Sequence, residues 1–323
     1  MRAVEIFQLT GPDSATRIAD LPEPAGDDAV VIDVKAAGVS FPEVLQTRGE
    51  YQYKPDLPFV PGSEVAGIVR SAPADSGLLA GDKVVAFCMS GAFAEVVAAP
   101  PAMTFPLPDG LDFAQGAALI LNYHTAYFAL VTRGRLAAGE TVLIHGAAGG
   151  VGTATIQVAK GLGARTIAVV STDEKAAVAK AAGADEAVRS DGAWKDDVLA
   201  LTDGKGVDIV IDPVGGDRFT DSLRSLNREG RLVVVGFTGG AIPEVKVNRL
   251  LLRNTEVVGA GWGEYVISSG LAYGAEVGVE IAKLAAAGHI NPPVGARFPL
   301  EQAAQALAML DNRQATGKVV LEI

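Results

Sequence analysis

The segment TVLIHGAAGGVGTATIQVAK, at positions 141–160 of this 323-residue sequence, is predicted to bring several free backbone amides close together. Residues 141–145 read as a buried strand, residues 146–152 as a glycine-rich turn and residues 151–162 as a helix with apolar side chains three and four positions apart. A strand that passes through such a turn into a helix directs free N–H groups and the positive end of the helix dipole at one point. That point suits a pyrophosphate.

The glycine spacing of the turn sharpens this interpretation. Ala147, Gly149 and Gly152 form the pattern A-x-G-x-x-G, one position away from the dinucleotide-binding pattern G-x-G-x-x-G. The pattern is informative only between a strand and a helix, and both are predicted here. We therefore predict that a dinucleotide pyrophosphate binds to the turn residues Ala147, Ala148, Gly149, Gly150, Val151 and Gly152.

The end of the next predicted strand indicates which dinucleotide binds. An NAD-preferring site places Asp or Glu there, about 20 residues beyond the turn, to accept both ribose hydroxyls. This strand ends Val170-Ser171-Thr172 without an acid, so a 2′-phosphate would meet no direct repulsion and we predict NADPH. Asp173 leaves NADH open, because turned inward it would select that coenzyme. Residues 171–174 also read as a capping box, with Ser171 as the N-cap residue.

The residues able to bind a metal ion are few. One cysteine and three histidines cannot build a four-cysteine zinc site, and the histidines lie in unrelated segments. Cys88 belongs to the apolar run 84–89 and is interpreted as a small buried hydrophobic residue. We expect no metal.

Charge and hydropathy exclude two other classes of partner. The formal net charge is −11 with no basic cluster longer than two residues, which argues against binding nucleic acid. No apolar run approaches the roughly 20 residues of a membrane helix. The first residues lack the apolar stretch of a signal peptide, and a single cysteine suits a reducing compartment, so we expect a cytoplasmic protein.

The chain reads as three regions. Residues 1–121 are rich in short β-type runs, residues 122–263 alternate strand and helix, and residues 264–323 contain too few elements to fold alone. The middle region predicts a doubly wound parallel sheet, and we expect the third region to complete the first domain, leaving a cleft between the two domains. Predicted strands are 29–36, 64–69, 83–87, 92–98, 141–145, 166–170, 187–188, 207–211, 231–236, 256–260 and 318–323, with a further short strand after residues 292–293. Predicted helices are 151–162, 174–182, 194–201, 219–226, 274–287 and 300–310.

Several motifs occur in one order along the whole chain, and together they resemble a known family. The sequence is similar to the zinc-independent quinone oxidoreductase branch, which includes zeta-crystallin, of the medium-chain dehydrogenase/reductase superfamily. The resemblance implies a Rossmann-type dinucleotide-binding domain and a mainly β GroES-like catalytic domain. The matching segments are 38–42, 57–67, 81–84, 146–152, 214–216, 236–237 and 317–321.

The resemblance also implies which residues form the substrate site. Zinc-dependent members carry a cysteine and a histidine where this chain has Ser40 and Ser63, neither of which is a plausible zinc ligand. Members of the zinc-independent branch usually have Asn at the place of Ser40 and Asp at the place of Glu43. The polar candidates are Ser40, Glu43 and Arg48, together with Tyr51 and Tyr53, which can donate a hydrogen bond or a proton to a substrate carbonyl.

Further cofactor contacts follow from the same resemblance. Ser171 and Lys175 match a serine and a lysine that cradle the 2′-phosphate, and Arg313 matches an arginine near the cofactor phosphates. Thr125 matches a threonine near the nicotinamide. Gly236, Phe237 and Thr238 end the fifth predicted strand, at the sheet edge where ligands of such folds collect.

The expected function is reduction of quinones or similar conjugated carbonyl compounds, by hydride transfer from NADPH without a metal. Two alternatives stay open: a 2-enoyl-thioester (acyl-CoA or acyl carrier protein) reductase, and a non-catalytic NADPH-binding role as a crystallin or in RNA contact. His145, just before the turn, is interpreted as shaping the turn rather than catalysing. The predicted edge strand 256–260 can pair with its copy, so we expect a homodimer.

Overall fold

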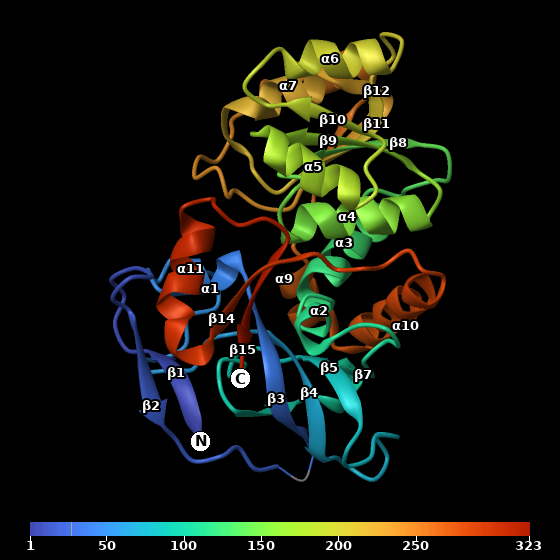
Figure 1. Ribbon diagram of the computed structural model, residues 1–323. Helices are drawn as coiled ribbons and strands as arrows, with labels where there is room; N and C mark the ends of the chain where they lie inside the picture. The colour runs from blue at the N-terminus through green and yellow to red at the C-terminus, as the bar shows by residue number, and fades with distance from the viewer. Residues whose placement is uncertain (27) are drawn as a thin grey trace. The chain divides into compact units, whose positions relative to one another are not determined.

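The computed structural model describes residues 1–26 and 28–323, and it divides into two compact units (Figure 1). Unit 1 comprises Met1–Leu121, Leu271–Ala286 and Pro292–Ile323, and unit 2 comprises Asn122–Gly270 and Ala287–Asn291. Each unit has its own sheet and its own core of buried apolar side chains. No helix in the described part of the chain is long and apolar enough to span a bilayer.

Unit 2 is built on a six-stranded parallel sheet in the order β10-β9-β8-β11-β12-β13. The chain starts near the centre, runs to one edge, then returns to build the other half. This is the doubly wound topology, so the predicted fold class is confirmed for this unit. Its strands are β8 (Thr141–His145), β9 (Arg165–Val170), β10 (Glu186–Arg189), β11 (Val207–Asp212), β12 (Leu226–Val234) and β13 (Glu256–Gly259).

Helices cover both faces of this sheet. Helices α4 (Gly150–Gly161) and α5 (Asp173–Ala181) contact each other and β9, whereas α6 (Trp194–Leu201) and α7 (Phe219–Arg224) pack together. In Figure 1 the strands of unit 2 lie between α6 and α7 above and α4 and α5 below. The central strands β8, β9 and β11 are almost wholly buried, as expected for a parallel sheet covered on both sides.

The segment before β8 is an irregular helical run. It consists of α2 (Phe113–Gly116), η2 (Ile120–His124), α3 (Thr125–Tyr127) and η3 (Phe128–Arg133), of which η2 and η3 are π-helical, a form frequent at functional sites. The other helical elements of unit 2 are η4 (Gly216–Arg218), α8 (Asn248–Arg253) and α9 (Trp262–Ser269).

Unit 1 contains a seven-stranded sheet in the order β14-β15-β3-β4-β5-β7, with β6 paired to β3, and a separate antiparallel pair β1-β2. Strand β15, close to the end of the chain, lies between β14 and β3, so late and early segments share one sheet. The strands are β1 (Arg2–Ile6), β2 (Thr16–Asp20), β3 (Val30–Val39), β4 (Glu64–Ser71), β5 (Lys83–Phe87), β6 (Val96–Ala99), β7 (Thr104–Pro106), β14 (Val294–Pro299) and β15 (Lys318–Glu322).

The helices of unit 1 are fewer. Gly278, within the long C-terminal helix α10, lies against the ring of Phe105, where a Cβ would come 2.3 Å from a ring carbon. This close approach explains the small residue on that face. The helical elements are α1 (Phe41–Gln46), η1 (Pro101–Met103), α2, which begins the irregular run described above, α10 (Ala272–Ala286), η5 (Leu300–Gln302) and α11 (Ala303–Asp311).

Two predicted strand starts are wrong, for a physical reason in each case. Strand β6 begins at Val96 instead of residue 92, because Phe93 bonds to Pro61 and to Val4 through its backbone rather than to β3. Strand β12 begins at Leu226 instead of residue 231, since pairing with β11 resumes across the irregularity there. Strands β1, β2 and β7 have no counterpart in the predicted set.

A buried ion pair joins β12 to the segment that precedes β8. Arg231 is 8% exposed, and its Nη1 and Nη2 donate to the two carboxylate oxygens of Glu140 at 2.7 and 2.8 Å. Its Nε donates to the carbonyl oxygen of Gly134 at 2.8 Å. This bidentate geometry satisfies the guanidinium inside the unit.

We expect Glu140→Gln to lower the free energy of unfolding of unit 2 by about 2 kcal/mol, because it leaves the Arg231 guanidinium buried without a carboxylate. Denaturant unfolding followed by tryptophan fluorescence measures this, since Trp194 and Trp262 both lie in unit 2. The matched control is Asp221→Asn in α7, whose pair with Arg224 is exposed and is worth less than about 1 kcal/mol. Equal losses in the two variants would contradict the assignment.

Candidate active site

The glycine-rich turn lies between β8 and α4 in unit 2. Gly146 adopts a left-handed conformation (φ 59°), and Gly149 is the extended N-cap residue of α4. Within the described residues no side chain caps this helix end, so the first-turn amides of Gly150, Val151 and Gly152 have no intrahelical acceptor. The turn is partly exposed at residues 149–151. These amides are available to an anion.

Close backbone approaches require small residues in this turn. A Cβ on Gly152 would come 2.3 Å from the backbone carbonyl oxygen of Gly146, and a Cβ on Gly150 would come 2.6 Å from the side-chain Nδ2 of Asn122. Ala147 and Ala148 are buried beneath the turn. An uncapped helix end with unobstructed amides, following a central parallel strand, fits the pyrophosphate of a dinucleotide.

The tip of β9 corrects one prediction. Thr172, not Ser171, is the N-cap residue of α5, because its hydroxyl accepts a hydrogen bond from the amide of Lys175 at 3.2 Å. The predicted capping role of Ser171 is therefore wrong. The Ser171 side chain stays exposed at the strand tip, beside the first turn of the helix that carries Lys175.

Asp173, which left NADH open at the level of the sequence, is paired with a cation. Its carboxylate accepts from Nη1 of Arg189 at 2.6 Å, and its side chain is 86% exposed. Arg189 ends β10 and also contacts Asp191 at 2.7 Å. Arg189 is a residue that the sequence reasoning missed; the signal was an arginine at the end of the strand that neighbours β9.

The remaining predicted cofactor residues are placed as follows. Thr125 is buried at the start of α3, and Phe237 is 38% exposed just after β12. Thr238 donates its hydroxyl to the carbonyl oxygen of Pro213 at 3.0 Å, which fixes the loop that also contains Gly236. Arg313 belongs to unit 1, follows α11 in a left-handed conformation (φ 58°) and is exposed.

His145 is a buried structural residue in this fold. Its Nε2 hydrogen-bonds to the hydroxyl of Ser222 at 2.8 Å, and its ring makes an edge contact with Trp194. Burial lowers the pKa of His145 well below its usual range, so the imidazole is neutral. The ring joins β8 to helices α6 and α7 rather than facing the turn.

Two of the predicted catalytic residues meet in unit 1, at the end of β3 and the start of α1. Ser40 is the N-cap residue of α1, and its backbone amide donates to Glu43 Oε2 at 2.8 Å. The other carboxylate oxygen of Glu43 accepts from the hydroxyl of Ser63 at 2.9 Å. Glu43 has no exposed surface, whereas Ser40 is 7% exposed and Ser63 more.

Lys318 is the residue of this cluster that the sequence reasoning missed. Its Nζ donates to Ser40 Oγ at 2.6 Å and is ion-paired with Glu64 Oε1. Glu64 Oε2 accepts from the amide of Leu121 at 2.9 Å. Sheet register explains the meeting, because Val319 of β15 pairs with Val39 of β3 and the next residues are Lys318 and Ser40. The available signal was a lysine in the otherwise apolar run 318–321.

Burial shapes the electrostatics of this cluster. It raises the pKa of Glu43 to about 7, against the attraction of the Lys318 ammonium and the hydrogen bonds from Ser63 and Ser40. It also raises the pKa of the Cys88 thiol to about 12, with Glu43 and Glu64 adding to the effect. Cys88 is thus a neutral, unreactive thiol.

The two predicted tyrosines differ in their surroundings. Tyr51 is partly buried, and burial together with the nearby charge of Glu43 raises the pKa of its phenol, which keeps it protonated. Tyr53 is 38% exposed. Arg48 is ion-paired with Asp311. The structure therefore brings Tyr51 to the cluster of Ser40 and Glu43, and leaves Tyr53 on the surface.

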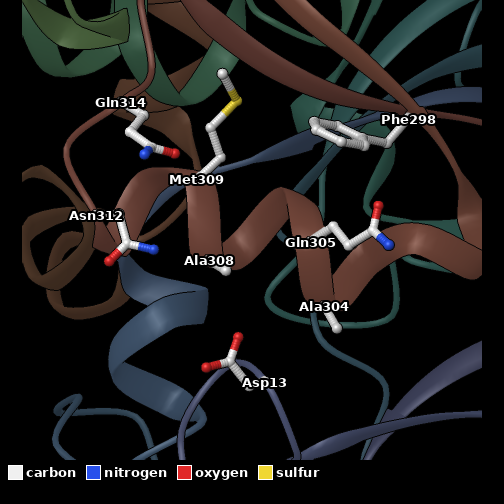
Figure 2. Close-up of a pocket in the computed structure, with 8 residues that line it drawn as sticks. All are labelled: Asp13, Phe298, Ala304, Gln305, Ala308, Met309, Asn312 and Gln314. Carbon is white, nitrogen blue, oxygen red and sulfur yellow. The ribbon is translucent and has the colours of Figure 1, made fainter.

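A hollow of unit 1 lies on α11, away from this cluster's residues (Figure 2). Its volume is about 550 Å³, and Asp13 points toward the helix from a neighbouring loop. None of the predicted site residues lines it. The lining residues are Asp13, Phe298, Ala304, Gln305, Ala308, Met309, Asn312 and Gln314.

Two family models match the sequence: the alcohol dehydrogenase GroES-like domain over residues 26–109 and the zinc-binding dehydrogenase model over residues 150–272. Quinone oxidoreductase-like protein 2 of Rattus norvegicus is 38% identical over 325 residues, covering 100% of this chain and 92% of that protein. The chain belongs to the quinone oxidoreductase branch of the medium-chain dehydrogenase/reductase superfamily. As a member of this branch it is an oxidoreductase, and the predicted family and fold are confirmed.

Solved structures agree over the full length. A probable oxidoreductase from Mycobacterium abscessus is 47% identical with a TM-score of 0.90, covering 100% of this chain and 99% of that one. The quinone oxidoreductase of Escherichia coli, solved in complex with NADPH, is 30% identical with a TM-score of 0.90, and both chains are covered completely. Unit 1 is accordingly the GroES-like part of this branch and unit 2 its Rossmann-type part.

A zinc ion does not fit the residues of this branch member. Across residues 1–26 and 28–323, no group of three or more His, Cys, Asp or Glu side chains could hold a metal. Ser40 and Ser63, which stand at two ligand positions of zinc-dependent relatives, are hydrogen-bonded to Lys318 and Glu43. An ammonium ion and hydroxyls are a poor donor set for zinc.

The pKa of Glu43 predicts a pH dependence of stability. Because the folded-state value, about 7, lies above the unfolded value, the folded state binds the extra proton, and stability falls as pH rises between about 4.5 and 7. Glu43→Gln removes this titrating group. We therefore expect the unfolding free energy of the wild type, relative to that of the variant, to fall by about 2 kcal/mol from pH 5 to pH 8. Calorimetric unfolding of both proteins measures it, and parallel pH profiles would contradict it.

Proposed function

We propose that this protein is an NADPH-dependent oxidoreductase that transfers hydride, without a metal ion, to quinones or similar conjugated carbonyl compounds. The observation that carries the proposal is the turn between β8 and α4, whose partly exposed amides lie at an uncapped helix end. The bound NADPH of the similar Escherichia coli quinone oxidoreductase supports it. So does the name of the relative from Rattus norvegicus.

Unit 2 is the proposed dinucleotide-binding domain. The turn amides would hold the pyrophosphate, and Ser171 and Lys175 would hold the 2′-phosphate at the tip of β9. Asp173 does not oppose this phosphate, because its carboxylate is already paired with Arg189. By resemblance, Arg313 contacts the phosphates, and the nicotinamide lies near Thr125 and residues Gly236, Phe237 and Thr238.

Unit 1 is the proposed catalytic domain. When bound, NADPH supplies a hydride, and the protein's task is to hold and orient the acceptor. The reduced oxygens of a quinone are stable as anions, so no metal is needed to stabilise them. Ser40 and Tyr51 offer neutral hydroxyls to the acceptor oxygens, while Glu43 lies behind Ser40 and holds its backbone.

Initial rates with NADPH and NADH against 1,4-benzoquinone, 9,10-phenanthrenequinone, an enal and crotonyl-CoA test this function. We expect turnover of the quinones with NADPH. Lys175→Ala should weaken NADPH affinity about tenfold and leave NADH affinity unchanged, because it removes a charge-assisted hydrogen bond to the 2′-phosphate. The control is Lys180→Ala, five residues further along α5, which contacts the carbonyl oxygen of Asp185.

Several outcomes would overturn the proposal. Turnover confined to crotonyl-CoA would make the protein a 2-enoyl-thioester reductase. Faster rates with NADH would show that Asp173 acts on the ribose. Tight, salt-sensitive binding of RNA without any turnover would favour a non-catalytic role, and stoichiometric zinc in the active protein would contradict metal-free chemistry.

We also propose that the protein is a homodimer formed through unit 2. Strand β13 is an edge strand, paired only with β12 within the described chain, and an open edge invites pairing with a second copy. Large apolar side chains in the segment that precedes β13 in the chain are highly exposed, which is typical of a contact surface. They are Ile242 (76%), Val247 (72%), Leu251 (77%) and Leu252 (74%).

Charged substitutions on this surface should dissociate the dimer. We expect Leu251→Glu combined with Leu252→Glu to shift the molar mass in solution from two chains to one, measured by size-exclusion chromatography with light scattering. Val279→Glu is the matched control, because Val279 is 54% exposed on α10 in unit 1. A wild-type protein of one chain, or dissociation by the control variant as well, would refute the proposed interface.

A further inference from the structure

The cluster around Ser40 has charged groups inside and hydroxyls outside. Glu43, Glu64 and Lys318 are 0%, 1% and 3% exposed, whereas Ser40 is 7% exposed and Ser63 is exposed further. Of this cluster, the proposed function uses the Ser40 hydroxyl and the Glu43 carboxyl that holds the Ser40 backbone, but it gives no role to Lys318. A buried ammonium directly behind that hydroxyl is not needed to build the sheet, where an apolar side chain would fill the same strand position.

Hydrogen-bond roles in the cluster are determined by the ammonium. Lys318 has only donors, so Ser40 Oγ accepts from Nζ at 2.6 Å. The Glu64 oxygens accept from Lys318 and from the amide of Leu121, and those of Glu43 accept from Ser63 and from the Ser40 amide. Among the described residues no acceptor takes the hydroxyl hydrogen of Ser40. That hydrogen can be donated to a ligand.

Strand pairing keeps the arrangement rigid. Val319 of β15 pairs with Val39 of β3, next to Lys318 and Ser40, and Val65 of β4 pairs with Ala37 of β3, next to Glu64 and Gly38. A Cβ on Gly38 would come 2.7 Å from Glu64 Oε1 and 2.3 Å from the carbonyl oxygen of Ala117. Gly38 thus leaves the space in which Glu64 meets Lys318, and the ammonium cannot turn away without breaking this pair.

We propose that Lys318 is a positioning residue that directs the Ser40 hydroxyl hydrogen to the acceptor oxygen and replaces the proton that Ser40 gives up. The inference rests on the proposed reductase function and deepens it. As hydride reaches the acceptor, its oxygen takes the proton from Ser40 Oγ, so that the O–H bond of Ser40 breaks. Lys318 Nζ returns a proton to Ser40 Oγ, and the resulting neutral amine regains one from solvent.

This role determines which acceptors need Lys318. A reduced oxygen that is a weak base, as in an electron-poor hydroquinone, leaves as an anion and needs little help. A reduced oxygen that is a strong base must be protonated as hydride arrives, and general-acid help of this kind is worth about 10²–10⁴ in rate. Dependence on Lys318 therefore rises with the basicity of the reduced acceptor.

The test compares the wild type with Lys318→Met combined with Glu64→Gln, which removes the ion pair as a unit, while Glu43 keeps its hydrogen bonds from Ser63 and from the Ser40 amide. Rates are measured on substituted 1,4-benzoquinones that span a range of hydroquinone acidity. We expect the loss in the double variant to grow about 100-fold from the most acidic to the least acidic hydroquinone. Ser40→Ala, which keeps the ion pair, should show the same trend. Lys83→Met, at the exposed first position of β5, is the control.

A second measurement needs no coenzyme. In the wild type, p-nitrophenol bound at Ser40 should have its pKa lowered by about one unit, seen as phenolate absorbance, because the charge-assisted hydrogen bond favours the anion. The double variant should lose this shift. As a separate control for folding, the double variant should still bind NADPH, which is followed by the change in NADPH fluorescence. A wild type that shifts p-nitrophenol but reduces no acceptor refutes the proposed function alone. An unshifted p-nitrophenol in the wild type, or uniform rate losses across the quinones in Ser40→Ala, refutes the role of Lys318.

Discussion

An α-helix cannot satisfy its own first-turn amides, and this constraint organises unit 2. Helix α4 leaves those amides without a side-chain cap within the described residues, directly after the central strand β8. The turn requires glycine at position 152, because a Cβ there would come 2.3 Å from the carbonyl oxygen of Gly146. At the neighbouring strand end, Asp212 accepts from the amides of Val214 and Gly215 at 2.9 Å each. The amides after β11 are thus satisfied by a carboxylate of the chain itself, whereas the amides after β8 can bind an anion.

Unit 1, in contrast, buries charged side chains inside a β-rich core. Two carboxylates and one ammonium are tolerated there because each is hydrogen-bonded, and because Glu64 and Lys318 neutralise each other. The remaining carboxyl, Glu43, holds a proton more readily than usual. The cluster presents hydroxyls outward where zinc-dependent relatives place metal ligands. In the proposed function it offers hydrogen bonds, rather than a Lewis acid, to the acceptor.

Coenzyme preference depends on partners as much as on residue types. An acidic residue near the tip of β9 would ordinarily argue for NADH. Here the carboxylate of Asp173 is paired with Arg189, which arrives from β10, the strand next to β9. Thr172 rather than Ser171 caps α5, so the Ser171 hydroxyl is not used by the helix. Neighbouring strands thus decide what a local motif can recognise.

The sequence by itself determined the elements whose signals are local. Apolar periodicity and glycine spacing located β8, α6 and the turn before α4, because 3.6-residue and two-residue repeats are read within one segment. Tertiary structure alone decided which side chains meet. Ser40 and Lys318 are 278 positions apart, and only the insertion of β15 beside β3 joins them. Pairing across such a separation depends on strand order and register, which no short window of sequence encodes.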